Sequence, residues 1–117
     1  MLSYILVKAN GILIGTPTYF DNVSALLKNF MDRTDPLSVG KKLKKKTVGL
    51  IVTGAMPEVL IRKTALKILN NFCAKNHEMI VKERLVITAY KKGEVQKNKK
   101  ALTSIRKLGE KIVKSIK

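Results

Sequence analysis

Apolar residues gather along this chain in three short runs, each followed by turn-forming or polar residues. The first run covers residues 11–15, which read Gly-Ile-Leu-Ile-Gly, and the second covers residues 47–54, which end in Thr-Gly. Continuous apolar runs of this length are typical of strands that are buried on both faces of a parallel sheet. A third strand is predicted at 79–81 or at 85–88, because the charged residues 82–84 leave both positions open.

Apolar residues also repeat at helical spacing, and they predict amphipathic helices near 23–34, 58–75 and 98–116. Asn22 or Ser24 is suited to cap the first helix, since either side chain accepts a hydrogen bond from an unpaired N–H of the first turn. The resulting order β-α-β-α-β-α predicts an α/β three-layer sandwich, in which right-handed crossovers join the strands of one parallel sheet.

Length and composition fit one domain, so residues 1–117 are expected to form a single domain with 45% hydrophobic residues to build its core. The start of the chain has neither a secretory signal nor an apolar run of transmembrane length, so we expect a cytoplasmic protein without a membrane partner. The connection 35–46 contains Pro36, Gly40 and five lysines, and it is expected to be a mobile basic loop.

The formal net charge of +16 favours anionic partners such as nucleic acid, phosphorylated cofactors or acidic lipid. Only four of the 24 basic residues are arginines, whereas specific recognition of bases relies on the planar guanidinium group. The lysines are spread over all the predicted helices, which is typical of solvated helix faces. Nucleic-acid association therefore stays an alternative, ranked below a small-molecule function.

Cys73 and His77 are the only cysteine and the only histidine of the sequence. A single cysteine excludes an intrachain disulfide, and these residues alone cannot build a cysteine-bound iron–sulfur cluster or a multi-cysteine zinc site. Cys73 lies on the apolar stripe of the predicted helix 58–75 and is interpreted as a core residue. His77 is interpreted as an exposed residue at a helix end. Neither a metal site nor a catalytic side chain is predicted.

The carboxyl ends of the first two predicted strands are the candidate binding region. Ligands of open parallel sheets bind outside the carboxyl ends of the strands, so residues 16–22 and 53–57 are expected to form neighbouring rims of one crevice. Thr18 offers a hydroxyl group, and Tyr19 and Phe20 offer flat rings on which a planar heterocycle can stack. The alternative is that these two rings plug the end of the core.

Twenty consecutive residues at this rim, Gly15 to Thr34, read GTPTYFDNVSALLKNFMDRT. This segment resembles the second flavin loop and the following helix of the NAD(P)H-dependent FMN reductase and iron–sulfur flavoprotein family. Residues 46–54 resemble the family's next strand and third flavin loop, and residues 108–111 resemble its closing helix.

The resemblance implies a flavodoxin-like fold and the function of an FMN-dependent NAD(P)H oxidoreductase, with FMN as cofactor and NAD(P)H as reductant. Hydride chemistry then belongs to the flavin, and no side chain is needed as an acid or base. The residues that the resemblance places at the flavin ring are Thr16, Pro17, Thr18, Tyr19, Phe20, Asn22, Thr53 and Gly54.

The resemblance also implies a truncated domain, because the family's first strands and its phosphate-holding loop have no counterpart in this sequence. Residues 1–10 resemble the helix that precedes the family's third strand. FMN binding by this chain alone is therefore expected to be weak or absent. Two alternative functions follow, namely a non-catalytic basic binding module and one half of a split flavoprotein.

The flavodoxin strand order 2-1-3-4-5 predicts how the truncated domain is covered. Two crossovers in one direction place the helices 23–34 and 58–75 on one face, and the last helix lies on the other. The strand at 11–15 is left with an unpaired edge, which readily recruits another strand or surface. We expect a homo-oligomer, or a complex with a separately encoded partner chain, with Ile12, Leu13 and Ile14 close to the contact. The segment 1–8 is expected to cover that edge in a monomer.

Overall fold

A computed structural model describes residues 2–116, and its centre is a sheet of three parallel strands. The strands are β1 (Gly11–Pro17), β2 (Thr47–Gly54) and β3 (Ile80–Thr88), in the order β1-β2-β3. The third strand joins the two predicted positions, since it covers 80–81 of the first and all of 85–88. Lys82 and Arg84 fit inside it because β3 is an edge strand whose side chains alternate between exposed and half-buried positions.

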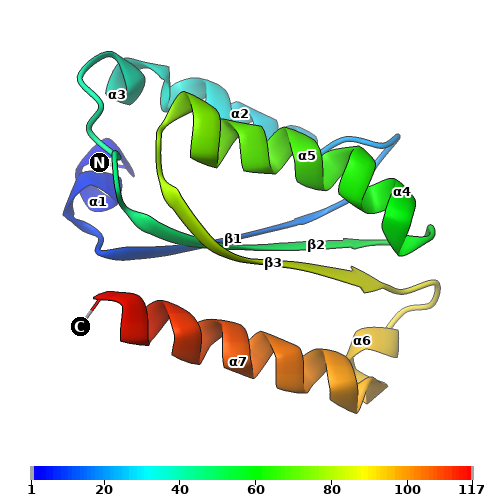
Figure 1. Cartoon of the computed structure of the whole chain (residues 1–117). Helices are drawn as coiled ribbons and strands as arrows, with labels where there is room; N and C mark the ends of the chain where they lie inside the picture. The colour runs from blue at the N-terminus through cyan, green and yellow to red at the C-terminus, as the bar shows by residue number, and fades with distance from the viewer. Residues whose placement is uncertain (1, 117) are drawn as a thin grey trace.

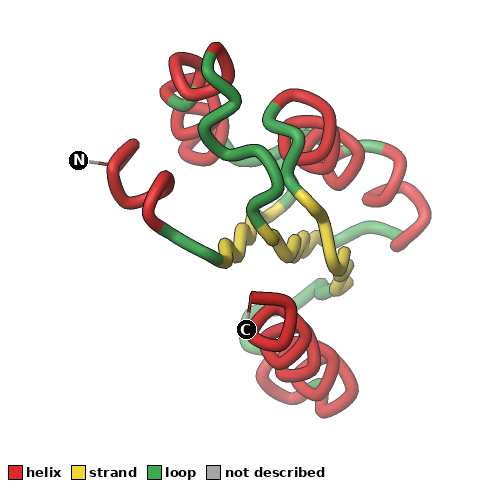
Figure 2. The backbone as a smooth tube through the Cα atoms, turned by 60° about the vertical axis from the view of Figure 1, so that its left-hand side comes forward, coloured by secondary structure: helices red, strands yellow, loops and turns green. Residues whose placement is uncertain are grey.

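Helices cover the two faces of the sheet unequally (Figures 1 and 2). One face carries the larger group of helices, and α7 lies on the other face with the short α6 at its start, as the crossover argument predicts. The helices of the larger group are α2 (Ala25–Arg33), α3 (Asp35–Val39), α4 (Glu58–Lys63) and α5 (Ala65–Asn70), followed by the π-helical turn η1 (Asn71–Asn76). The remaining helices are α1 (Leu2–Lys8), α6 (Glu94–Lys97) and α7 (Lys99–Ile116). The predicted α/β three-layer arrangement is confirmed.

The helix predicted over 58–75 is interrupted at Thr64, where φ is −118° and ψ is −96°. The Thr64 hydroxyl donates to the Leu60 carbonyl at 2.7 Å, which gives that oxygen a side-chain donor at the break. The apolar stripe nevertheless stays on one side, since Ile61, Ala65 and Leu69 are all fully buried. Helical periodicity therefore predicted the buried face correctly and missed the break.

The connection 35–46 is not the free loop that its composition predicted. Its first residues form α3, with Pro36 in the first turn, and Leu43 is only 1% exposed. Lys46 Nζ donates to the carbonyl oxygens of Val7 and Ala9 at 2.7 and 2.6 Å, and so it caps the end of α1. The burial of Leu43 and the hydrogen bonds of Lys46 therefore fix a segment whose composition predicted a mobile basic loop.

Strand β2 forms the centre of the core because both of its faces are covered. Val48, Leu50 and Val52 are fully buried on the face of α4 and α5. On the opposite face, a Cβ atom added to Gly49 would lie 2.8 Å from Cδ1 of Leu108, so this glycine allows α7 to approach the sheet closely. Among residues 2–116 we find no helix that is both long enough and apolar enough to cross a membrane.

Candidate functional site

The carboxyl ends of the three strands meet at one rim, on the right of Figure 1. Pro17 at the end of β1 pairs with Thr53 of β2, and Gly54 pairs with Thr88 at the end of β3. The Ala89 N–H donates to the Gly54 carbonyl at 3.0 Å and fixes the third strand end beside the second. The two predicted rims, 16–22 and 53–57, are therefore neighbours.

Thr16 and Thr18 hold the first rim in place through their hydroxyl groups. Thr16 is 5% exposed, and its Oγ1 accepts the Ser24 N–H at 3.1 Å and donates to the Pro17 carbonyl at 2.9 Å. Thr18 donates both its backbone N–H and its hydroxyl to the Thr53 carbonyl, at 2.8 and 3.0 Å. Both side chains thus serve the backbone of the loop and tie it to β2.

Gly54 of the second rim lies directly against Thr18 of the first. A Cβ atom added there would lie 2.9 Å from the Thr18 Oγ1 and 3.1 Å from its Cβ. Real Cβ atoms essentially never approach other atoms that closely, so the glycine makes room for the threonine. The pairing of Thr18 with Gly54 is a contact that the resemblance alone did not reveal.

Residues 19–22 form a tight turn that projects two aromatic rings. Tyr19 and Asn22 exchange two backbone hydrogen bonds of 3.1 Å, and the central residues Phe20 and Asp21 have φ values of 49° and 62°. Positive φ at both central positions is the signature of a type I′ turn. The Phe20 side chain is fully exposed and Tyr19 is 61% exposed, so the alternative that these rings plug the core is wrong.

The left-handed conformation of Phe20 costs free energy, since bulky residues rarely adopt it. We expect Phe20→Gly to raise the free energy of unfolding by about 0.5–1 kcal/mol, because glycine removes the strain but loses more backbone entropy. Asp21→Gly is the control and should give a smaller gain, since aspartate tolerates this conformation better. Urea denaturation followed by circular dichroism measures both values. A Phe20→Gly variant less stable than the parent would contradict the assignment of strain to this ring.

Asn22 and Ser24 were both candidates for the N-cap of α2, and the structure assigns this role to Ser24. The Ser24 hydroxyl accepts the Leu27 N–H at 3.1 Å and is the N-cap. Asn22 is exposed, and its Oδ1 accepts the neighbouring Val23 N–H at 2.7 Å. Val23 is 6% exposed and anchors the returning chain in the core. The turn is therefore fixed at both ends and free at its tip.

Backbone donors remain available at this rim. Within residues 2–116, the N–H groups of Phe20, Asp21, Ala55 and Met56 donate to no other group of the protein. Two exposed rings beside unpaired N–H groups suit a planar heterocycle that carries hydrogen-bond acceptors. The described residues contain no group of three or more histidine, cysteine or acidic side chains that could hold a metal ion.

Cys73 is buried in the core, as its place on the apolar stripe predicts. Burial raises the pKa of its thiol to about 12, because the thiolate loses its hydration inside the protein. The thiol therefore stays protonated at neutral pH and does not serve as a nucleophile.

The interpretation of His77 as an exposed residue is wrong. Its side chain is 2% exposed, and its ring lies edge-on to Phe72 with centroids 4.8 Å apart. The π-helical turn η1 turns the chain inward here, and the His77 N–H donates to the Phe72 carbonyl at 3.2 Å. Nothing in the local sequence signals this burial, because it depends on Thr34, 43 residues away, whose hydroxyl lies 2.9 Å from Nε2.

Comparison with known proteins gives matches over most of the chain. A sequence model of a family described as NADPH-dependent FMN reductase matches residues 1–93. An iron-sulfur flavoprotein of Methanocaldococcus jannaschii is 34% identical over 118 aligned residues, which cover 94% of this chain. The match covers 60% of that protein, so the chain spans about three fifths of the length of this relative.

Two solved structures share the fold at low sequence identity. The Trp repressor binding protein of Bacillus subtilis has a TM-score of 0.79 at 17% identity, over 92% of this chain and 67% of that one. General stress protein 14 of Treponema denticola, solved in complex with FMN, has a TM-score of 0.72 at 16% identity, over 93% and 70%. With three parallel strands between helices and these neighbours, the flavodoxin-like fold is confirmed.

Proposed function

The chain belongs to the NADPH-dependent FMN reductase family, and we propose that it supplies the isoalloxazine-binding rims of an FMN-dependent NAD(P)H oxidoreductase. One observation carries this proposal. The tight turn after β1 holds Phe20 in a strained conformation and exposes its ring together with that of Tyr19. Strain of this kind persists where function requires the geometry, and exposed rings beside unpaired N–H groups suit a flavin.

In this proposal each part of the two rims has a separate role. Tyr19 and Phe20 contact the flavin ring, and the N–H groups of the turn donate to its oxygen and nitrogen atoms. Thr16, Pro17, Thr18 and Asn22 hold the turn in position, and Thr53 and Gly54 form the neighbouring rim. When bound, the flavin supplies the hydride chemistry, with NAD(P)H as the reductant, and the protein orients its ring.

The charge at the rims limits how tightly FMN can bind. Residues 16–22 and 53–57 contain no lysine or arginine, so they offer no counter-charge to the phosphate of FMN. We therefore expect this chain alone to bind FMN weakly, and to bind riboflavin about as well as FMN at raised salt. Fluorescence titration of both flavins measures this. A preparation that retains equimolar FMN through purification would contradict the expectation of weak binding.

The aromatic turn is tested by Tyr19→Ala, which we expect to weaken riboflavin binding about tenfold, a typical effect of losing one stacking ring. Tyr4→Ala is the matched control, because Tyr4 is 66% exposed and belongs to α1, the helix that lies beyond the opposite end of β1 (Figure 1). The same titration applies to both variants. Equal riboflavin affinities in Tyr19→Ala and the parent would remove the turn from the flavin site.

We also propose that β1 pairs with a further chain, either a second copy or a separately encoded partner. Strand β1 is at the edge of the sheet, and Leu13 is 56% exposed on the α7 face. In Figure 2, α1 stands beyond the amino end of β1 and does not run along it. The proposal is supported by this free edge, since unpaired strands with apolar side chains recruit partners.

Association through β1 is tested by Leu13→Lys, which should lower the average molar mass in sedimentation equilibrium if copies of the chain associate. Leu26→Lys is the control, because Leu26 is 81% exposed on α2. An oligomer that survives Leu13→Lys would place the contact elsewhere. If the parent is a monomer at every concentration, the remaining form of the proposal is a separately encoded partner.

A further inference from the structure

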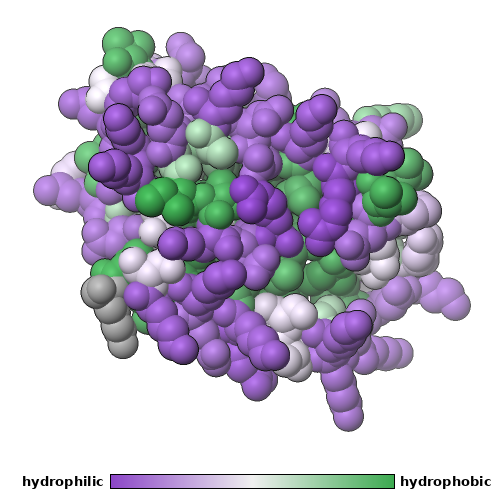
Figure 3. Space-filling view, in the orientation of Figure 1, coloured by the Kyte–Doolittle hydropathy of each residue, from purple (hydrophilic) through white to green (hydrophobic). Residues whose placement is uncertain are grey.

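A groove runs along the second half of β3, at the edge of the sheet opposite to β1. It has a volume of about 320 Å³, its floor is residues 85–88, and its walls come from α4 and from the start of α7. In Figure 1, β3 lies in front of the other strands, between the upper helices and α7. Figure 3, in the same orientation, shows hydrophobic atoms over this strand between the hydrophilic side chains of the helices.

The first half of β3 is protected against pairing with another chain, and the protection ends at Arg84. Lys82 has no partner in β2, so the strand bulges there. The backbone N–H of Arg84 donates to the Glu83 carboxylate at 3.1 Å and is therefore occupied. Bulges and charged side chains keep edge strands from recruiting other chains. Residues 85–88 read Leu-Val-Ile-Thr and have neither a charge, a proline nor a bulge, so this half of the edge is open.

The open half presents backbone groups that point away from the sheet. Successive residues of an edge strand direct their N–H and C=O groups alternately toward the neighbouring strand and away from it. The Ala89 N–H donates to the Gly54 carbonyl of β2 at 3.0 Å, so the residues two and four positions before Ala89 also face β2. Val86 and Thr88 therefore direct their N–H and C=O groups outward. Such a row of backbone groups is the template to which an extended chain adds as a strand.

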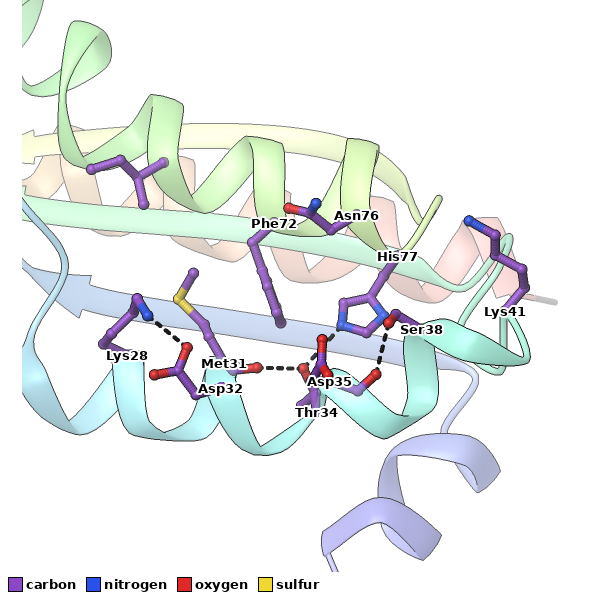
Figure 4. A pocket seen from close by; sticks show the side chains of 11 residues that line it. Lys28, Met31, Asp32, Thr34, Asp35, Ser38, Lys41, Phe72, Asn76 and His77 are labelled. Carbon is purple, nitrogen blue, oxygen red and sulfur yellow. Dashed lines mark hydrogen bonds and ion pairs between the residues drawn. The ribbon is translucent and has the colours of Figure 1, made fainter.

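The charge of the groove favours an acidic occupant. Lys100 lines the groove from α7, is exposed, and forms no ion pair within residues 2–116. On the opposite wall, Arg62 pairs with Glu58 at 2.9 Å. The hollow between α2, α3 and η1 in Figure 4 differs, since its cations are paired, as Lys28 is with Asp32 at 2.6 Å. The β3 groove thus combines an open strand edge with an uncommitted cation, in a chain with a net charge of +16.

A second copy of this chain does not fit the edge. Two β3 edges that pair symmetrically are related by a two-fold axis perpendicular to the sheet, and this axis places the two α7 helices side by side. Helix α7 contains six basic residues and one acidic residue. Self-pairing would therefore bring like charges together, which opposes association.

We propose that residues 85–88 of β3 bind an extended acidic segment of a partner protein, which adds to the sheet as a further strand. The backbone of the segment pairs with the outward N–H and C=O groups of Val86 and Thr88. Its carboxylates pair with Lys100, and apolar side chains between them cover the half-buried Leu85. The site shares no residue with the proposed flavin rims and lies at the opposite edge from the contact proposed for β1.

The probe is a short dye-labelled peptide in which glutamate and valine alternate, with both ends blocked. Fluorescence anisotropy with the full chain at about 0.15 M salt should show binding below about 1 mM. The same peptide with lysine in place of glutamate is the control and should not bind comparably. Equal binding of the two peptides, or no binding of the acidic peptide at millimolar concentration, would overturn the proposal.

Pairing with the strand edge is tested by Val86→Pro, which removes an outward N–H. Proline is tolerated at an edge position whose N–H faces solvent, so circular dichroism should show a folded variant. The acidic peptide should bind about tenfold more weakly to Val86→Pro, whereas Val86→Ala, which keeps the N–H, should change its affinity less than about twofold. Equal affinities of the two variants, or a Val86→Pro variant that does not fold, would contradict an outward N–H that pairs with the segment.

Hydrogen exchange of the parent tests the same contact without a substitution. The amides of Val86 and Thr88 should exchange more slowly when the acidic peptide is added, whereas the amide of Ile87, which faces β2, should not change. Unchanged exchange at Val86 and Thr88 would exclude strand addition. Loss of an oligomer in Val86→Pro, measured by sedimentation equilibrium without peptide, would assign the edge to a second copy instead and overturn the proposal.

The contribution of Lys100 is separated from that of the overall charge by two variants of equal net charge. Lys100→Glu should weaken binding of the acidic peptide about fivefold. Lys114→Glu is the control, because Lys114 lies in the last turn of α7, away from the groove, and it should change the affinity less than about twofold. Equal effects of the two variants would mean that the peptide responds only to the net charge of the protein, and would remove Lys100 from the site.

Discussion

Replacing Leu108 by alanine is expected to lower the free energy of unfolding by about 3 kcal/mol, within the range of about 2–5 kcal/mol for buried leucines. Leu108 is 1% exposed, and it packs over Gly49, where the absence of a side chain lets α7 approach the sheet. On its face of the sheet, α7 is the long covering helix (Figure 1). A loss of this size is a large share of the stability of a domain this small.

Leu102→Ala is the matched control for this prediction. Leu102 belongs to the same helix and is 41% exposed, so both variants change the helix propensity equally and differ in burial. We expect the control to cost under about 1 kcal/mol. Urea denaturation of both variants measures the difference, and equal losses would mean that α7 is not held by Leu108.

The Cys73 thiol is expected to react with iodoacetamide at pH 8 about a thousand times more slowly than an ordinary cysteine, since its pKa is raised to about 12. Unfolding in urea should restore the ordinary rate, because the thiol then regains its hydration. Alkylation followed by mass spectrometry measures both rates. A native-state rate close to that of free cysteine would show that the thiol is accessible.

The same pKa shift predicts the pH dependence of stability. The folded protein keeps the Cys73 proton up to about pH 12, whereas the unfolded chain releases it near the ordinary value of 9.0. Stability from this group is complete below pH 9 and falls above it by about 1.4 kcal/mol per pH unit. Cys73→Ala should lack this contribution, so the stability difference between parent and variant should shrink between pH 9 and 10. A stability difference between parent and variant that stays the same from pH 9 to pH 10 would contradict the raised pKa of Cys73.

The hydrophilic surface of the molecule illustrates why composition alone did not identify a function. Hydrophilic side chains cover most of the face in Figure 3, and hydrophobic atoms appear in a band between the upper helices and α7. Within residues 2–116, several cations are committed to ion pairs, such as Lys41 with Glu78 and Arg62 with Glu58. A net charge is a sum over the chain and does not say which cations are free.

The layers of this protein and the place of its candidate flavin rims could be predicted from local patterns along the chain. Strand β2 was predicted with its final bounds, and the helices fell on the predicted faces, because apolar periodicity records which side of each element is buried. The motif at the end of β1 likewise predicted a turn-forming rim at 16–22, since glycine, proline and threonine at a strand end are local signals, and the structure closes a tight turn at 19–22 within it.

Contacts between residues distant in sequence became known only from the folded arrangement. The exposure of Phe20 follows from a turn closed by two backbone bonds and anchored by Thr18 on β2. The burial of His77 depends on Thr34, which is 43 residues away in sequence and is brought beside it by the packing of α2 and η1. Lys46 caps a helix only because α1 ends beside it. Local pattern fixes which residues turn inward or outward within an element, whereas such contacts arise only when the elements pack against one another.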